Sequence, residues 1–202
     1  MAIARTSRLE AVNTMMSVIG EAPVNDLTAS SATADVIMAG NTLDEVSREV
    51  QAYGWDFNRE VLVKLVPNGD NEIVLSMSVA EVDIEPLDAG SKEYVQRGGR
   101  LYNKTDHTFT ISSELKATIV YILDWVDLPQ VARHYVMIRA SRKFQDRVVG
   151  SEKHHTFNQQ DEFQSLIALR AAEARSGDFT IFDNYDVSRV LDRGNAFNRI
   201  TT

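Results

Sequence analysis

The stretch from Asp127 to Gly150 constrains the fold more than any other, because its pattern predicts one long helix that is apolar on several sides. Asp127 suits the N-cap, Pro129 fits the first turn, and Gly150 favours a left-handed stop. A helix with so broad an apolar surface must be covered on more than one side. The apolar positions are Val131, Tyr135, Val136, Met137, Ile138, Phe144 and Val148.

This helix also has a basic edge, although the whole chain carries a net charge of −8. Arg133, Arg139, Arg142, Lys143 and Arg147 stand against the acid Asp146. Because clustered positive charges repel one another, we expect acidic residues beside this edge, either in the same subunit or in another copy. We expect contacts between subunits to use Arg139, Arg142 and Arg147. The alternative is that they pair within the subunit with Asp44, Glu45 or Glu49, and the sequence favours neither.

Composition excludes several classes of protein. The 202 residues include no cysteine, so a disulfide framework, a thiolate metal site and a cysteine nucleophile are all excluded. No apolar run approaches the ~20 residues of a membrane span, and the first residues lack the apolar core of a secretory signal. We therefore expect a soluble intracellular product with no membrane partner. The acidic balance argues against a protein that coats nucleic acid.

Three further helices are expected around the central one. The first runs from about Ser7 to Ile19, capped by Thr6 or Ser7 and ended by Gly20. The second has two seven-residue series that end before Gly54, namely Val36, Leu43 and Val50, and Ala39, Val46 and Tyr53. The fourth is expected to be capped at Asn158 and to stop at Gly177.

Between the second and third helices the period changes from helical to alternating. Residues 59–67 and 72–79 are predicted to form two strands joined by a turn, and Val82 and Ile84 mark another. Short strands are expected in YVQRGGRLYN (94–103), about Gly98 and Gly99, and in HTFTIS (107–112). The last, within 114–125, is expected to be mostly buried because it is a continuous apolar run. Trp55 and Phe57 are expected to pack where helices and sheet meet.

These patterns together predict an α+β fold. It is a discontinuous helical bundle of about four helices, with an inserted β-rich domain and an extended C-terminal tail. The expected domains are 1–57 with 126–177 for the bundle, 58–125 for the insert and 178–202 for the tail. The chain therefore leaves the bundle after the second helix and returns to it at the start of the third.

The residues indicate no catalytic chemistry. The carboxylates at strand ends, such as Asp83, Glu85, Asp124 and Asp127, are typical of solvated surface groups. His154 and His155 are adjacent and therefore point apart, so a metal site would need other ligands. Gly98-Gly99 is not followed by Lys-Ser/Thr, and a hairpin turn explains it better than a phosphate loop. We expect no catalytic, cofactor-binding or metal-binding residue, hence a structural or interaction protein.

Five segments, in order, resemble the tail tubular protein A family of short-tailed bacteriophages. They are AVNTMMSVIGEAPVNDL, EVSREVQAYGWDFNRE, YVQRGGRLYNKT, DLPQVARHYVMIRASRKFQDRVVG and, more weakly, IFDN. The resemblance covers about Leu9 to Asn184. It implies a virion protein, assembled in the host cytoplasm, that forms a dodecameric head–tail adaptor ring. That ring would join the portal to the nozzle protein (tail tubular protein B type), anchor tail fibres and let DNA pass without sequence-specific binding.

The resemblance and the residues together give a second set of interface candidates. The Gly98-Gly99 turn would present Arg97 and Arg100 at a hairpin tip, flanked by Tyr94 and Tyr102, and Tyr and Arg are enriched at interface hot spots. We expect this hairpin to face the nozzle and fibres. The tail, with Phe182, is expected to face the portal.

Two other classes of function stay open at this point. One is a glycan-degrading enzyme of a phage tail, which would need a carboxylate pair facing a cleft. The other is a nucleic-acid-binding packaging factor, which would bind duplex DNA with a strong salt dependence.

Overall fold

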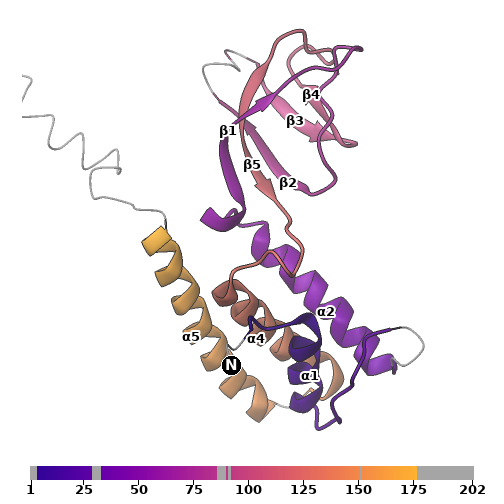
Figure 1. Cartoon of the computed structure of the whole chain (residues 1–202), viewed down its shortest axis with the longest axis vertical. Coiled ribbons are helices and arrows are strands. Elements are labelled where there is room, and N and C mark those ends of the chain that lie inside the picture. The colour runs from indigo at the N-terminus through magenta and orange to yellow at the C-terminus, as the bar shows by residue number, and fades with distance from the viewer. Residues whose placement is uncertain (1–3, 29–32, 86–89, 91, 151, 177–202) are drawn as a thin grey trace, which may run out of the picture.

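The computed structural model describes residues 4–28, 33–85, 90, 92–150 and 152–176. Its helices lie together at one end and its strands at the other (Figure 1). The predicted α+β fold, a helical bundle interrupted by a β-rich segment, is confirmed. The predicted tail, including Phe182, lies outside the described residues.

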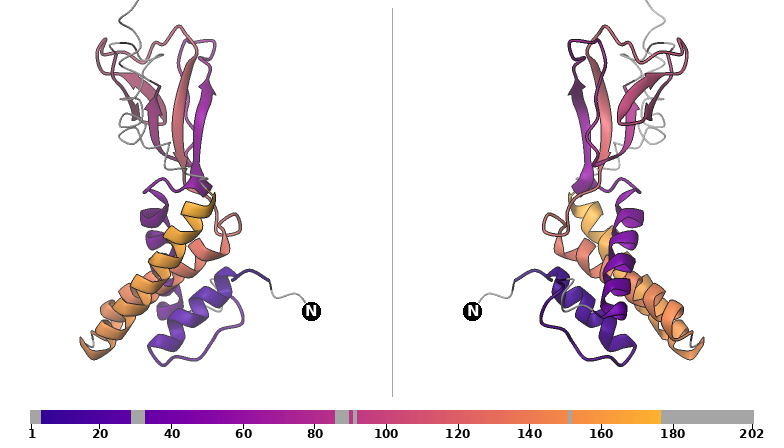
Figure 2. Two further views of the ribbon diagram at one scale, coloured as in Figure 1. Left: turned by 90° about the vertical axis from the view of Figure 1, so that its left-hand side faces the viewer. Right: turned by 90° about the vertical axis from the view of Figure 1, so that its right-hand side faces the viewer.

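The bundle is arranged around the helix that the sequence singled out. Helices α1 (Arg8–Val18), α2 (Ala34–Gln51) and α5 (Glu152–Ser176) all contact α4 (Gln130–Val148). Figures 1 and 2 show α4 enclosed among these neighbours. The apolar surface of α4 is therefore covered on several sides, as predicted. The core that results includes Val12, Met15, Leu43, Val46, Val50, Tyr135, Val136, Phe144 and Leu169, all buried.

The predicted ends of the first two helices are close to the observed ones. Ser7 and Glu10 form a capping box at the start of α1, and Gly20 follows its end with a φ of +82°. Thr33 caps α2 by accepting a hydrogen bond from the Val36 amide (3.4 Å). The heptad positions in α2 are buried, except that Tyr53 lies beyond its end and is 76% exposed.

The other two helices begin elsewhere than predicted. The N-cap of α4 is Pro129, not Asp127, and it makes no side-chain capping bond. A residue before proline is disfavoured in the helical region, so the helix begins only after Pro129. Asp127 lies in the preceding turn, where its amide donates to the Asp124 carbonyl (3.0 Å). The helix α5 begins at Glu152, six residues before Asn158, because no Gly or Pro interrupts the chain after Gly150.

The strands form a three-stranded antiparallel sheet and a separate hairpin. The sheet has the order β1-β5-β2, from β1 (Arg59–Leu65), β5 (Leu115–Tyr121) and β2 (Val79–Ile84). The hairpin joins β3 (Tyr94–Arg97) to β4 (Arg100–Asn103). Every second residue of β5 from Leu115 to Ile119 is buried, as predicted for the last strand. This second core includes Leu65, Ile73, Leu75, Ile84, Leu101, Ile111, Leu115 and Ile119.

Two strand predictions are wrong. Residues 72–79 do not return beside β1, whose partner is β5, and only Val79 belongs to a strand. Instead this segment lies along the hairpin, where the Leu75 amide donates to the Gly99 carbonyl and the Leu101 amide to the Ile73 carbonyl (both 2.9 Å). Burial of Ile73 and Leu75 satisfies the alternating pattern there. Residues 107–112 form only an isolated bridge between Asn103 and Thr108.

Two buried amide side chains form hydrogen bonds where the chain passes from the helices to the sheet and back. Gln51 Nε2 donates to the Leu123 carbonyl (3.1 Å), and Gln51 Oε1 accepts from the Leu123 amide (2.7 Å). Asn58 Nδ2 donates to the carbonyls of Gln51 (2.8 Å) and Tyr121 (2.6 Å). The two crossings, far apart in the sequence, are thereby tied together.

The aromatic residues beside this junction pack as predicted. Trp55 and Phe57 are partly buried against the helical core. The indole N–H of Trp55 donates to the Val50 carbonyl (2.6 Å). Because its polar atom is satisfied, this ring fixes the direction in which the chain leaves α2.

Candidate interaction surfaces

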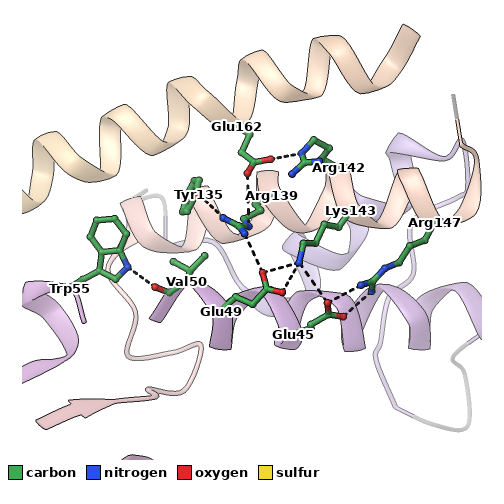
Figure 3. A network of polar contacts seen from close by, with 10 residues as sticks. All are labelled: Glu45, Glu49, Val50, Trp55, Tyr135, Arg139, Arg142, Lys143, Arg147 and Glu162. Carbon is green, nitrogen blue, oxygen red and sulfur yellow. Dashed lines mark hydrogen bonds and ion pairs between the residues drawn. The ribbon is translucent and has the colours of Figure 1, made fainter. Parts of the chain in front are cut away.

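The basic edge of α4 lies between acidic residues of α2 and α5 (Figure 3). Lys143 Nζ contacts Glu49 (2.6 Å), and Arg147 Nη2 contacts Glu45 (2.8 Å). Ion pairs between elements this far apart in the sequence hold the helices in register. The remaining pairs of the network are Arg139–Glu49, Arg139–Glu162, Arg142–Glu162, Arg142–Asp146 and Lys143–Glu45.

The charges in this network stabilise one another. The hydrogen bond from Arg147 is the main cause that lowers the pKa of Glu45, and the same bond raises the pKa of Arg147. Burial opposes the charged form of Arg139, but hydrogen bonding to Tyr135 and the nearby carboxylates outweigh it, so the pKa of Arg139 is raised. These cations are therefore held charged at neutral pH.

The structure thus contains the pairing within the subunit that the sequence allowed for Glu45 and Glu49. The third acid of that alternative, Asp44, pairs with Arg8 instead (2.7 Å). Of the three arginines expected at subunit contacts, Arg139 and Arg142 have side chains only 24% and 21% exposed, whereas Arg147 is 46% exposed. Their role between subunits stays a prediction.

Arg133 belongs to the same helix but makes no ion pair with a described residue. Its side chain donates to three main-chain carbonyls, those of Leu128 (2.9 Å), Thr6 (2.9 Å) and Val126 (2.6 Å). The indole of Trp125 also donates to the Thr6 carbonyl (3.0 Å). Arg133 therefore ties the chain before α1 to the chain that leaves the sheet. The sequence placed it on the basic edge, but nothing in its pattern indicated that it is buried.

The hairpin turn has the geometry that its glycines predicted. Gly98 and Gly99 have φ values of +57° and +73°, and positive φ at both central residues is what a type I′ hairpin turn requires. The guanidinium of Arg97 lies over the ring of Tyr102, 4.1 Å from its centroid. Arg97 is otherwise exposed at the tip of the hairpin. Its cation is thus held at a surface position by an aromatic ring.

The other candidates in the hairpin are engaged within the chain. Arg100 Nη1 contacts both carboxylate oxygens of Glu72 (2.8 Å each), and its guanidinium lies 4.2 Å from the centre of the Phe109 ring. Tyr94 is partly buried against the core of the sheet. Tyr102 stacks edge-on against Phe109, with ring centres 4.8 Å apart. The structure therefore brings all four hairpin candidates to one small region, with Arg97 the most accessible cation.

The carboxylates considered for catalysis stay on the surface. Asp83, Asp124 and Asp127 are exposed, and Glu85 accepts a hydrogen bond from the Thr118 hydroxyl (3.2 Å). Over the described ranges, no three His, Asp or Glu side chains gather where they could hold a metal ion. Among the helices that the structure describes, none is both long and apolar enough to cross a bilayer.

Comparison with known proteins gives consistent matches over most of the chain. A family model described as tail tubular protein matches residues 9–179. Tail tubular protein A of Klebsiella phage KP34 is 27% identical over 164 residues, which cover 80% of this chain and 84% of that relative. The match spans the helical bundle and the sheet together, so it concerns the whole described fold rather than one motif.

Proposed function

Because this chain belongs to the tail tubular protein family, we propose that it is the adaptor between the portal and the nozzle in the tail of a short-tailed bacteriophage. It is a structural protein of a phage tail. The observation that carries the finer proposal is the family match across both the bundle and the sheet. A subunit with helices at one end and strands at the other also offers two unlike ends for two partners (Figure 2).

In this proposal the subunits form a dodecameric ring with DNA passing through its channel. A ring requires two different faces that meet head to tail. The net charge of −8 suits a channel that repels phosphate and therefore does not retain DNA. The portal, a nozzle of the tail tubular protein B type and the tail fibres would be its partners, and assembly would take place in the host cytoplasm.

The hairpin is the surface that we propose for the nozzle and fibre side. Arg97 supports this choice because its cation is exposed, and its stack on Tyr102 reduces the entropy that binding would cost. Arg97→Ala should therefore weaken nozzle binding about tenfold, as expected for an interface hot spot. Lys104→Ala is the matched control, since Lys104 is an exposed cation after β4 that pairs with Glu93 (2.7 Å).

Binding of both variants to the purified nozzle should be measured by calorimetry, with circular dichroism to confirm that each is folded. Equal affinities for Arg97→Ala, Lys104→Ala and the unchanged protein would remove the hairpin from the interface. Arg97 is preferred to Arg100 here, because loss of Arg100 would also break its contact with Glu72. If Arg97→Ala weakened binding to the portal and left nozzle binding unchanged, the hairpin would face the portal instead of the nozzle.

Ring contacts along the basic edge of α4 remain part of the proposal, and Arg147 is the residue best exposed for them. Exchanging the pair, Glu45→Arg with Arg147→Glu, keeps an ion pair inside the subunit while it reverses what a neighbour meets. We expect this exchange to reduce ring formation in sedimentation experiments and to leave the monomer folded. Rings that form normally would show that these charges act only within the subunit.

We propose no catalytic function for this protein. The glycan-degrading alternative requires two carboxylates set across a cleft. Asp83 and Glu93 line one pocket, but Lys92 and Lys104 line it too, and Glu93 pairs with Lys104 (2.7 Å). Purified protein should release no sugar from capsule or lipopolysaccharide above buffer. Turnover that disappears on a single carboxylate-to-amide substitution would establish an enzyme instead.

A further inference from the structure

A small aromatic and basic pocket lies beside the junction between helices and sheet. Its walls come from α4, α5 and the residues after α2, and Figure 3 includes three of its members, Trp55, Tyr135 and Arg139. The other lining residues are Tyr53, Leu166 and Arg170. No role described above uses this pocket.

The size of the pocket selects the kind of occupant. Its volume is about 120 Å³, well below the roughly 300–1,000 Å³ of small-molecule sites. A cavity of about 150 Å³ holds one benzene molecule. At about 120 Å³ the pocket is slightly smaller than that cavity, so a single aromatic ring of a peptide is the largest group that it suits. Tyr53, which is 76% exposed, leaves the aromatic wall accessible from outside.

The charged residues of the pocket indicate which residue should stand next to the aromatic one in the bound segment. Arg170 is exposed and makes no hydrogen bond or ion pair with any described residue. Arg139 already pairs with Glu49 and Glu162. The free cation at this position is therefore Arg170. An aromatic residue followed by a carboxylate would fill the pocket and neutralise that cation.

The sequence after α5 contains such a pair. Residues 178–186, DFTIFDNYD, include three aspartates and no basic residue, and both Phe182 and Tyr185 are followed by an aspartate. Phe182 has the smaller side chain of the two and suits a pocket of about 120 Å³ better. These residues lie outside the part of the chain that the structure describes. We propose that the pocket binds Phe182 of its own chain, with the Asp183 carboxylate on Arg170.

The length of the connection agrees with this assignment. Arg170 lies six residues before Ser176, the last residue of α5, or about 9 Å along the helix. Phe182 lies six residues after Ser176, a span of up to ~20 Å, which is enough to return to the pocket. Phe179 lies three residues after Ser176, a span of up to about 10 Å, and is followed by Thr180. Of these two phenylalanines, only Phe182 precedes a carboxylate, and Phe179 is thus a matched control.

The test uses the full chain and the indole N–H signal of Trp55 in nitrogen-15 NMR spectra, assigned with a Trp125→Phe variant. Phe182→Ala should shift the Trp55 signal, whereas Phe179→Ala should leave it in place. Arg170→Glu should have the same effect as Phe182→Ala, and Arg175→Glu, on the same helix outside the pocket, should have none. If Phe182→Ala and Arg170→Glu both leave Trp55 unchanged, the proposal is wrong.

Two further measurements identify the occupant. A synthetic peptide of residues 178–186 should restore the Trp55 signal of the Phe182→Ala protein, and it should bind about tenfold more weakly when Arg170→Glu is added, as for a lost charged hydrogen bond. The exchange Arg170→Asp with Asp183→Arg should restore the original signal in one chain. Restoration by unlabelled wild-type protein, dependent on its concentration, would instead assign the pocket to a neighbouring copy and contradict the same-chain proposal.

Discussion

The helical bundle and the sheet differ in how much of their surface they use within the subunit. Basic residues of α4 pair with acids of α2 and α5, and sixteen apolar residues form the described bundle core, against ten in the sheet. The sheet region leaves large apolar side chains in solvent, among them Val61, Val66, Val74 and Met77, each at least 64% exposed. The bundle is therefore the more extensively packed part of the subunit, although it too exposes apolar side chains such as Ile37 and Phe163, at 51% and 58%.

The largest expected effect compares a buried aromatic residue of the bundle with an exposed one. Phe144 is fully buried, so Phe144→Ala should lower the free energy of unfolding by about 3–5 kcal/mol. Phe163 is 58% exposed on α5, and Phe163→Ala should change it by less than about 0.5 kcal/mol. Chemical denaturation measures both. Equal losses would mean that the bundle core does not dominate stability.

The next effect concerns the buried cation that links three main-chain segments. Arg133→Met removes three hydrogen bonds at a residue only 5% exposed, and it should lower the free energy of unfolding by about 2–4 kcal/mol. Arg48→Met, at an exposed position on α2, is the control and should change little. If the two variants have the same denaturation midpoint, Arg133 does not secure the chain before α1.

Alanine substitutions at two glycines, one at the junction and one at the hairpin tip, distinguish the cost of backbone strain from the cost of a steric clash. Both Gly54 and Gly98 have positive φ, so alanine at either should cost about 1 kcal/mol. A Cβ at Gly54 would also lie 2.9 Å from Val120 Cγ2, whereas at Gly98 nothing lies within 4 Å. Gly54→Ala should therefore lower the melting temperature more than Gly98→Ala. If Gly98→Ala lowered the melting temperature more than Gly54→Ala, the hairpin rather than the junction would tolerate a side chain less well.

The smallest effect is the dependence of stability on pH through the ion pairs of α4. The folded state lowers the pKa of Glu45 from its ordinary value of 4.5, chiefly through the bond from Arg147. Its contribution is therefore present above the unfolded pKa and is lost as the pH falls through the folded one. Between pH 5 and 3, unchanged protein should lose slightly more stability than Glu45→Gln. If the two proteins lost stability equally between these pH values, the Glu45–Arg147 pair would contribute nothing to the pH dependence of stability.

Sequence reasoning predicted the fold where local pattern and tertiary packing agree. The Ser7 cap of α1, the heptad positions of α2 up to Val50 and the paired glycines of the hairpin each specify local geometry, and all three are observed. The pairing of β1 with β5 joins residues fifty or more positions apart. An alternating pattern predicts the inward face of a strand but not its partner, so the predicted pairing of 72–79 with β1 is wrong.

The candidate sites show the same limit. The turn that presents Arg97 follows from Gly98 and Gly99, whereas the bonds of Arg133, Gln51 and Asn58 depend on chain segments that meet only in three dimensions. The domain limits at 58–125 and 178–202 stay predictions. Limited proteolysis that cuts near these limits first would support them.

The adaptor proposal is tested most directly by electron microscopy of the purified protein mixed with its portal. We expect twelve copies in a closed ring on one face of the portal, with an open channel along the axis. Free subunits beside unoccupied portals, under conditions in which both proteins are folded, would contradict it.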